Sequence, residues 1–392
     1  MISTYSRIHH LKQTINALKK NTLADTSHLY IFSDAPKPGD EDKVSEVRRY
    51  LKSVTGFKKV CIVERQTNGR TYNNRQGLKF LLEKYGKVIL LEDDNLTAPG
   101  FLDFMNEALD VYKHSPQVLS VSGYLPPINT NTVQTNAVLI KRFTGWGVGL
   151  WKDKYELIKK ISAEEFNRLK NTPKQLSLLK ERYGEDLYNR FRAESLGHLD
   201  AIDVRACYLQ FKSRLSSVYP RYSLIRNIGN DGSGLHSSVN DKYDTQLWTK
   251  TGEFELNDTL KEDRTIDDEV VSFYRPDHRD MSPEIVQNII HQLTSANISN
   301  ICLWGTDVLT DILLEKISHS PFHVKYVMDT WAEQGQCHKG YELITPAQAI
   351  ERGERNFVIL SFASRFKMKA AAEKLSAELN IFMYQEQSEP PI

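Results

Sequence analysis

The chain has 392 residues, 26% of them charged, and a formal net charge of +1 at pH 7. That length predicts one large domain or two ordinary ones, and the balanced charge argues against a nucleic-acid binder that relies on electrostatics. The sequence has no apolar run long enough to span a bilayer, no signal-peptide core at its start and no CxxC pair among Cys61, Cys207, Cys302 and Cys337, so we expect a cytoplasmic protein with reduced thiols.

Strand and helix patterns alternate at the start of the chain. Strands are predicted at residues 2–6, 29–32, 60–63 and 88–91, and apolar residues at helical spacing predict helices at 8–18, 44–54 and 78–85. Such strand–helix units build a parallel sheet with right-handed crossovers. The first strand is short, as if the chain began inside it, which is expected of a truncated start.

The rest of the chain has two polar regions and a second α/β pattern. Residues 152–192 have a charged helical pattern typical of a solvated face, and residues 240–280 predict an ordered tail and a linker. Strands are predicted again at 301–304, 324–328, 357–362 and 381–384. The first turn of this part, from Gly305, lacks the second and third glycines of the dinucleotide fingerprint, so we expect no nucleotide there despite Asp329. The predicted domains are residues 1–275 and 281–392.

Polar side chains follow each of the first four predicted strands. The fourth ends in Glu92, Asp93 and Asp94, and carboxylates are hard oxygen ligands suited to Mg²⁺ or Mn²⁺ carrying a diphosphate. The residues after the other three strands are Ser6, Arg7, Ser33, Asp34 and the stretch 64–69. Any one of them is equally a turn residue, and the acidic triplet alone is equally a charge cluster at a helix start. Together they favour a ligand site at the carboxyl edge of the sheet.

Several motifs occur in order between Met1 and Tyr243. They are TYSR (4–7), IFSDAPKPGDEDKV (31–44), KVILLEDDNLTAPGFLDFMNEAL (87–109), VSGY (121–124), GWGVGLWKD (145–153) and YPRYSLIRNIGNDGSGLH (219–236). With these motifs the chain resembles the inverting, metal-dependent GT-A glycosyltransferases, specifically bacterial family 2-like enzymes related to the Golgi N-acetylglucosaminyltransferases. The resemblance implies a GT-A nucleotide-diphospho-sugar transferase fold, a mostly parallel α/β sheet with flanking helices, followed by a smaller C-terminal Rossmann-like α/β domain.

The resemblance assigns roles to the acidic triplet. Asp94 resembles the carboxylate that coordinates the metal, Mn²⁺ or Mg²⁺. Asp93 would lie nearer the ribose or a metal-bound water. Glu92 resembles the first residue of the triplet, whose side chain is held by hydrogen bonds.

Other strand-end residues receive donor-binding roles. Asp34 resembles the residue that recognises the base, and Ser6 and Arg7 would line the nucleotide pocket. The stretch NGRTYNN, which begins at Asn68, matches a helix-opening segment that usually reads NLGLAKN. Here one residue is lost and Arg70 replaces an apolar residue, so Asn68 is expected to contact the donor and Arg70 a phosphate.

The catalytic base is assigned within HLDAIDVR, residues 198–205. Asp203 resembles the aspartate held against the acceptor hydroxyl, with Asp200 as the runner-up. The alternative is structural: a helix N-cap at Asp200 and a salt bridge between Asp203 and Arg205.

Two more assignments each have an open alternative. Gly145-Trp146-Gly147 predicts backbone close to a sugar with the indole stacked on the ring, or else a tight turn with a core tryptophan. His236 is expected to supply an imidazole to the same metal, or else to be a solvent-facing loop histidine.

The resemblance implies transfer of a sugar from a nucleotide-diphosphate sugar, with a UDP-sugar favoured, to a hydroxyl of a glycan or lipid-linked glycan. The product would be a bacterial surface glycan, made with peripheral membrane association at the inner face of the cell membrane. The alternative is a catalytically degenerate GT-A binding or scaffold subunit, which the altered segment at Asn68 allows. A sugar-nucleotide pyrophosphorylase would need a glycine-rich loop after the first strand, and TYSRIHHLK has no glycine. The sequence names neither donor, acceptor nor oligomeric state.

Overall fold

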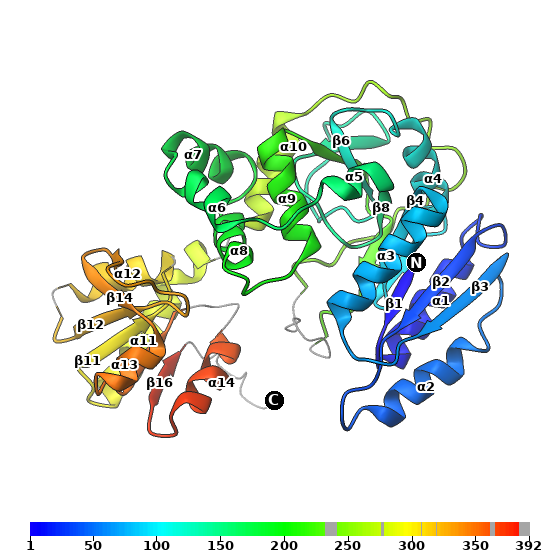
Figure 1. The fold of residues 1–392 in the computed structure, drawn as a ribbon. Coiled ribbons are helices and arrows are strands. Elements are labelled where there is room, and N and C mark those ends of the chain that lie inside the picture. Colours follow the sequence, from blue (N-terminus) through cyan, green and yellow to red (C-terminus); the bar gives the residue numbers. More distant parts are fainter. Residues whose placement is uncertain (232–240, 276–277, 307, 319, 361–364, 384–392) are drawn as a thin grey trace, which may run out of the picture. The chain divides into compact units, whose positions relative to one another are not determined.

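The computed structural model describes residues 1–231, 241–275, 278–306, 308–318, 320–360 and 365–383. The chain forms two compact units, Met1–Arg275 and Pro276–Ile392. Each unit is a sheet with flanking helices (Figure 1), which confirms the predicted α/β class. No helix in the described part of the chain is long and apolar enough to cross a membrane.

An eight-stranded sheet forms the centre of the first unit, in the order β3-β2-β1-β4-β8-β6-β9-β7. Its strands are β1 (Ile2–Thr4), β2 (His28–Ser33), β3 (Lys59–Glu64), β4 (Lys87–Glu92), β6 (Val118–Ser122), β7 (Ala137–Ile140), β8 (Val148–Trp151) and β9 (Ser216–Pro220). The strands β1 to β4 pair in parallel, as the strand–helix alternation predicts. Beyond β4 the sheet is mixed, because β8 pairs antiparallel with both β4 and β6. A two-stranded antiparallel pair, β5 (Asn95–Thr97) and β10 (Ile225–Asn227), lies outside this sheet.

The helices that connect the parallel strands are α1 (Ile8–Lys19), α2 (Glu41–Leu51) and α3 (Arg70–Tyr85). Several predicted boundaries differ from the observed ones. The largest difference is at α3, which begins at Arg70 rather than at residue 78. The strand β1 ends at Thr4 rather than Ser6, because the chain already turns toward α1, and α2 ends at Leu51 rather than Val54. These ends are where helices fray and turns begin, so periodicity locates them poorly.

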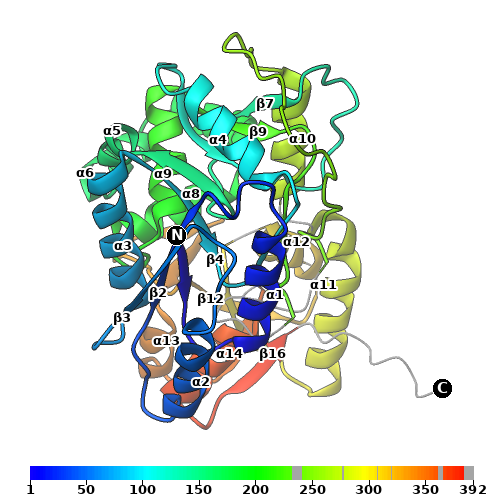
Figure 2. The same cartoon turned by 90° about the vertical axis from the view of Figure 1, so that its right-hand side faces the viewer.

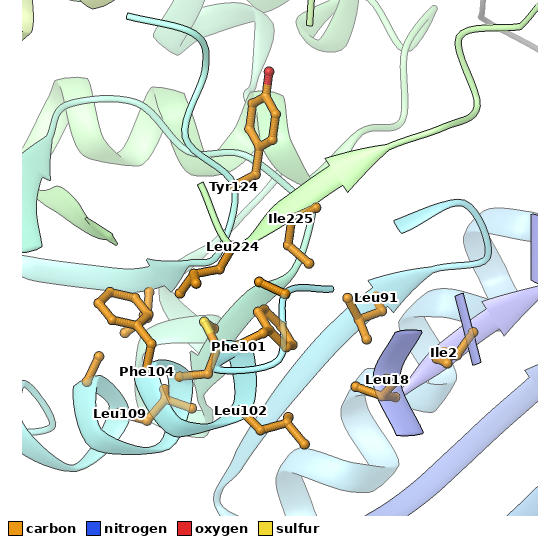
Figure 3. Packing of buried hydrophobic residues seen from close by; sticks show 14 of the residues in the cluster. Ile2, Leu18, Leu91, Phe101, Leu102, Phe104, Leu109, Tyr124, Leu224 and Ile225 are labelled. Atoms are coloured by element: carbon orange, nitrogen blue, oxygen red, sulfur yellow. The ribbon is translucent and has the colours of Figure 1, made fainter. Parts of the chain in front are cut away.

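Apolar side chains pack on both faces of this sheet. On one face, α1, α2 and α4 (Phe101–Val111) cover the sheet, with Leu18, Leu91 and Leu102 in one cluster. Figure 3 shows Leu18 and Leu91 near Ile2 of β1, and Leu102 on α4. The other face is covered by α3 and α9 (Ile202–Ser213). Because β1, β2 and β4 are covered on both faces, they read in the sequence as continuous apolar runs.

The charged region after β8 is helical, as predicted. Its helices are α5 (Lys152–Leu157), α6 (Ala163–Lys170), α7 (Pro173–Arg182) and α8 (Asp186–Ser195). Phe166, Leu179 and Phe191 are buried in the same cluster as α3. The region is therefore a packed layer with a charged outer surface rather than a solvated face alone.

The region 240–280 contains a helix that the prediction of a polar tail and linker missed. The helix α10 (Arg264–Tyr274) begins after Asp263, whose side chain accepts a hydrogen bond from the Thr265 amide at 2.8 Å. Its buried Ile266 and Val270 pack against Tyr219 of β9. The i, i+4 spacing of these two residues is the helical signal, which the surrounding polar residues obscured.

The second unit contains a six-stranded sheet in the order β13-β14-β12-β11-β15-β16. Its elements are α11 (His278–Ser295), β11 (Asn300–Trp304), α12 (Val308–Ile317), β12 (His323–Met328), β13 (Cys337–His338), β14 (Tyr341–Ile344), α13 (Pro346–Glu351), β15 (Asn356–Ile359), α14 (Arg365–Leu375) and β16 (Asn380–Met383). All neighbours pair in parallel except β13, which is antiparallel to β14. The strand β15 ends at Ile359, earlier than the predicted Phe362. Figure 2 shows the same elements from a second side.

Candidate functional site

The strand order of the first unit reverses at one position of the sheet, the place where open α/β sheets have their ligand crevice. From β1 the chain adds β2 and β3 on one side, and then β4 on the other side of β1. The crossover connections at β1 and β4 therefore leave in opposite directions, and ligands of open α/β sheets bind at such a reversal, at the carboxyl ends of the strands. Arg7 follows β1, and Asp93 and Asp94 follow β4. The predicted site residues thus flank the crevice.

A three-residue ionic network occupies this position. The Arg7 guanidinium donates to Asp93 Oδ1 at 2.5 Å and to Asp94 Oδ2 at 2.6 Å. Thr4 donates from its hydroxyl to Asp93 Oδ2 at 3.0 Å. Both aspartates are buried, with 4% and 6% of their surface exposed. Charges this deep need a partner, and Arg7 supplies it.

The pKa shifts in this network follow from burial and from the charges. Burial raises the pKa of Asp93, and the Arg7 charge counteracts part of that rise. Burial by itself would lower the pKa of Arg7, but attraction to Asp93 and Asp94 outweighs it and raises the value. Arg7 is therefore a permanent cation held by two carboxylates.

A loop from a distant part of the sequence closes over Asp94. Asn227 Nδ2 and Asn95 Nδ2 each donate to Asp94 Oδ1 at 3.0 Å. The Ile228 amide donates to the Asp94 carbonyl at 2.9 Å. Gly229 is packed so closely that a Cβ there would lie 2.2 Å from Asp94 Oδ2. The antiparallel pairing of Asn227 with Asn95 fixes this approach.

Asp34, the predicted base-recognition residue, lies at the end of β2 and is buried. Its carboxylate accepts from the Ala35 amide at 2.9 Å and from the Gly69 amide at 3.1 Å. Asn68 Nδ2 lies 3.4 Å from Asp34 Oδ2 and donates to the Ala35 carbonyl at 2.7 Å. Asp34 and Asn68 are thus brought together, and Asp34 also anchors the start of α3 to the end of β2. Base recognition by Asp34 stays a prediction.

The first turn of α3 carries a second ion pair at the same edge. Arg70 donates to Glu92 Oε1 at 3.1 Å, and 55% of the Arg70 side chain is exposed. Burial of the Glu92 carboxyl and the nearby Asp94 charge raise its pKa to about 7, although 29% of its side chain stays exposed. Arg70 is therefore a positive charge at the carboxyl edge of the sheet, paired with Glu92 and partly exposed to solvent.

The turn Gly145–Gly147 also lies at this edge. The strand β8 runs antiparallel to β4 with Val148 opposite Leu90, so the turn before β8 lies at the carboxyl end of β4. The Trp146 ring meets the Tyr124 ring edge to face at a centroid distance of 4.8 Å. Gly147 has φ 64°, and a Cβ on it would lie 2.6 Å from Ile225. Packing therefore accounts for Gly147, and sugar stacking by Trp146 stays a prediction.

The two candidate bases lie around the first turn of α9, and both are ion-paired. Asp203 accepts from Arg190 at 2.7 Å. Asp200 accepts from Arg75 of α3 at 2.8 Å and also pairs with Arg205. The alternative structural account is therefore wrong in both details: Ala201 is the N-cap residue, and Arg205 pairs with Asp200 rather than Asp203.

The two candidates differ in the number of arginines that they contact: Asp203 pairs with Arg190, and Asp200 with Arg75 and Arg205. Burial acts to raise the pKa of Asp200, but Arg205 and Arg75 outweigh it and hold the value below its usual range, which weakens Asp200 as a proton acceptor. Arg75 and Arg70 are both on α3, about 7.5 Å apart along its axis. The helix α3 therefore links the neighbourhood of Asp200 to that of Glu92.

The acidic pair has the donor chemistry for Mg²⁺ or Mn²⁺, but its oxygens already have partners. All four carboxylate oxygens of Asp93 and Asp94 accept hydrogen bonds, from Arg7, Thr4 and two asparagines. Within the described residues, no group of three or more His, Cys, Asp or Glu side chains could hold a metal ion. Without a bound donor, the described residues therefore do not supply a complete set of ligands for a cation. His236, the other predicted ligand, lies outside the described residues.

The structure therefore brings together most of the predicted donor-site residues and adds some that sequence reasoning missed. The predicted residues at this edge are Ser6, Arg7, Asp34, Asn68, Arg70, Asp93, Asp94, Trp146 and Gly147. The missed ones are Thr4, Thr14, Asn95 and Asn227; Thr14 donates to the Asp93 carbonyl at 2.9 Å. Thr4 and Asn227 lie in the quoted motifs TYSR and YPRYSLIRNIGNDGSGLH, so the signal was present, but only tertiary contact shows that Thr4 meets Asp93 and Asn227 meets Asp94.

Comparison with known proteins gives a limited result. No protein-family model and no curated protein matches the chain. Among solved structures, it is similar to TarS of S. aureus, with 12% identity and a TM-score of 0.28 over 50% of this chain and 42% of TarS. For TarS 1-349 in complex with UDP, the identity is 14% and the TM-score 0.29, over 46% of this chain and 53% of that one. The chain thus spans about half the length of these two TarS chains.

A second similar structure covers more of the chain. The apo-form glycosyltransferase GlyE of Streptococcus pneumoniae TIGR4 shares 11% identity at a TM-score of 0.23, over 99% of this chain and 92% of GlyE. TM-scores this low transfer neither a detailed fold nor an activity to the chain.

Proposed function

We propose that the first unit is a glycosyltransferase that binds a nucleotide-diphosphate sugar, with a UDP-sugar favoured, at the crevice between β1 and β4. The observation that carries this proposal is the convergence of Arg7, Asp93 and Asp94 at the reversal of strand order. Buried charge is costly to maintain and is concentrated at functional sites. The acceptor is a hydroxyl of a glycan or lipid-linked glycan in bacterial surface glycan synthesis, and attack in line with the departing diphosphate inverts the anomeric centre.

Each part of the crevice suits a part of such a donor. The guanidiniums of Arg7 and Arg70 match phosphate oxygens, to which arginine donates two hydrogen bonds at once. Asp34 and Asn68 offer an acceptor and a donor for the edge of a base. Trp146 offers an aromatic face at the end of β4.

Net charge supports a divalent cation that enters together with the donor. One guanidinium against two carboxylates leaves one net negative charge in the network, which repels an anionic diphosphate. Bound Mn²⁺ or Mg²⁺ would neutralise charge on the diphosphate. Since the carboxylates are occupied by Arg7, we expect Mn²⁺ alone to bind weakly and Mn²⁺ with the donor to bind well.

Asp203 is proposed as the base that accepts the acceptor's proton, with Arg190 holding its carboxylate. Asp203→Asn should lower turnover by about two to four orders of magnitude, the usual contribution of a general base, and leave donor affinity unchanged. Asp200→Asn is the matched control, and its turnover should fall much less. Near-normal turnover of Asp203→Asn would show that another group is the base.

The test of the proposed function is thermal stabilisation and donor hydrolysis with UDP-, GDP-, dTDP- and CMP-sugars, with and without Mn²⁺. One donor should raise the melting temperature in the presence of Mn²⁺, and Asp94→Asn should abolish that rise. Asp311→Asn, at a partly exposed aspartate of the second unit, should behave like the wild type. A folded protein that responds to none of these donors would contradict the proposal.

A binding or scaffold subunit is the second candidate. The observation that favours it is the complete pairing of the Asp93 and Asp94 oxygens with protein donors. Such a subunit would be stabilised by a donor but would not hydrolyse it. Measured hydrolysis that depends on Asp203 would exclude this candidate.

A further inference from the structure

The strand β3 forms one end of the eight-stranded sheet (Figure 1). Within the described residues, the strand that pairs with it is β2, in an unbroken register along the whole of β3. The four central residues, Val60 to Val63, are uncharged and only partly buried. Edge strands are usually protected from pairing with a further strand by a charge, a proline or a bulge within them. The centre of β3 has none of these devices.

The backbone groups that point away from the sheet belong to the even-numbered residues of β3. The Arg65 amide donates to the Ser33 carbonyl of β2 at 2.9 Å. Because successive residues of a strand point their backbone groups to alternate sides, the odd-numbered residues bond to β2, and Val60, Ile62 and Glu64 point outward. Among the residues that the structure describes, these outward groups have no hydrogen-bond partner. Such a row of donors and acceptors is a template for another strand.

Exposed aromatic side chains lie beside this open edge on the side of α3. Tyr30 of β2 is the register partner of Cys61. The Phe80 and Tyr85 rings of α3 meet the Tyr30 ring edge to face at centroid distances of 6.2 and 5.9 Å, and both are exposed. Aromatic side chains are enriched at protein interfaces. This face of the edge therefore suits a protein partner.

The charges around β3 are complementary to those of a second copy of the same strand. A two-fold axis perpendicular to the sheet pairs two copies antiparallel and keeps the α3 side of each on the same face. Residues directly opposite each other must then point to the same face, so even-numbered residues meet even-numbered ones. With the axis at Cys61, Val60 lies opposite Ile62 of the second copy. Lys58, which is exposed, lies opposite Glu64 of the second copy at both ends of the pair.

The neighbouring symmetric register is less favourable. With the axis at Ile62, Lys59 would lie opposite Arg65 of the second copy, which places like charges together, and Val60 would lie opposite Glu64. Registers centred nearer either end of β3 pair fewer of its residues. The Glu64 side chain keeps 33% of its surface exposed, and its contact with Arg48 is long, at 3.6 Å. It can therefore accept a second cation.

We propose that β3 is a self-association surface, at which two copies of this chain pair antiparallel about a two-fold axis at Cys61. The two sheets then continue into one another, with hydrogen bonds between Val60 and Ile62 of opposite copies and an ion pair between Lys58 and Glu64 at each end. The surface is independent of the proposed transferase activity, because the candidate donor site lies at the carboxyl ends of β1 and β4.

Sedimentation equilibrium of the full chain tests the register through a charge swap. Lys58→Glu and Glu64→Lys each set like charges opposite each other twice per dimer, and each should raise the dissociation constant about tenfold or more. The double variant restores opposite charges and should return the dissociation constant to within about threefold of the wild type. Positions 58 and 64 are about 20 Å apart along one strand, so this recovery reports on contact between copies. Lys113→Glu, an exposed control with the same change in charge, should dimerise like the wild type.

Cys61 gives a second measurement that leaves the charges unchanged. In this register it lies opposite its own copy as a non-hydrogen-bonded pair, whose Cα atoms are about 4.5 Å apart, within the reach of a disulfide. Diamide, which takes up the two electrons and two protons of the two thiols, should link two copies of Cys337→Ser, the variant that removes the exposed Cys337. Adding Cys61→Ser to that variant should abolish the link.

Three results would overturn the proposal. The first is a wild-type chain that stays monomeric up to its limit of solubility. The second is a dimer that neither Lys58→Glu nor Glu64→Lys weakens, because its interface would lie elsewhere. The third is a dimer that both single variants weaken and the double variant fails to restore, because Lys58 and Glu64 would then not be opposite each other.

Discussion

Arg7 holds together the two carboxylates at the centre of the candidate site, and its position explains why they can be buried. The Asp93 and Asp94 side chains keep only 6% and 8% of their surface exposed. Removing one partner of such a buried network leaves charge without compensation, which costs far more than breaking a surface pair. The side chains of the site can therefore be ranked by burial according to how much their removal should destabilise the protein.

The first prediction concerns this ranking. Arg7→Met keeps an apolar stem but strands two buried carboxylates, so it should lower the free energy of unfolding by about 3–5 kcal/mol. Arg70→Met is the matched control, because Arg70 pairs with Glu92 at the surface and should cost less than about 1 kcal/mol. Urea unfolding of both variants measures the difference. Equal costs would show that Arg7 is not the counter-ion of the buried pair.

Glu92 makes the stability of the first unit depend on pH. Its pKa is about 7 in the folded protein, against an ordinary value of 4.5. As pH rises through this interval, the unfolded chain has released the proton while the folded chain still holds it, so stability is lost. Relative to Glu92→Gln, the wild type should therefore become less stable between pH 4.5 and about 7. Unfolding in urea at several pH values, with EDTA present, measures this. A difference that is constant with pH would contradict the raised pKa.

At the scale of elements, the turn before β8 and the strand pair β5 and β10 assemble the site. The turn carries Trp146 to the end of β4, and the pairing of Asn95 with Asn227 brings a distant loop onto Asp94. Both depend on glycines that allow close approach, Gly147 at the turn and Gly229 at the loop. These positions are sensitive to the addition of a single methyl group.

Gly147→Ala tests the turn. The glycine has φ 64°, and a Cβ would lie 2.6 Å from Ile225 in the core, so the substitution should destabilise the protein by about 1–3 kcal/mol. Gly145→Ala, two residues earlier, has nothing within 4 Å of its Cβ and should be close to neutral. Thermal unfolding compares the two. A neutral Gly147→Ala would mean that the turn relaxes around the methyl group.

For the whole molecule, the two units have separate cores. The clusters that contain Leu91, Leu81 and Tyr219 lie within Met1–Arg275, and those that contain Leu303 and Trp304 lie within Pro276–Ile392. A unit with its own core has what it needs to fold alone. The proposed donor site lies wholly in the first unit.

Cutting the chain after Arg275 tests this separation. The fragment Met1–Arg275 should unfold cooperatively by circular dichroism, and a nucleotide-sugar that stabilises the full chain should stabilise the fragment by the same number of degrees. A fragment that is folded but no longer binds the donor would show that the second unit contributes to the site.

The strand–helix order of the first part and the acidic end of β4 could be predicted from the sequence, because both are local. Continuous apolar runs identify buried parallel strands, and polar residues directly after them share one edge of the sheet. This reasoning located Arg7, Asp34, Asp93 and Asp94. Helical spacing should also have located α10, because Ile266 and Val270 lie four residues apart, but Asp267, Asp268 and Glu269 stand between them.

Only the tertiary structure decided which charges meet. The sequence by itself determined an α/β chain with carboxylates and guanidiniums at the ends of its parallel strands, since periodicity and residue type set these features. It did not determine that Arg7 occupies the oxygens expected to bind a metal, that Asn227 reaches Asp94, or that Asp203 pairs with Arg190. Each of these depends on contacts between residues far apart in the chain, which follow from strand order and register and not from local pattern.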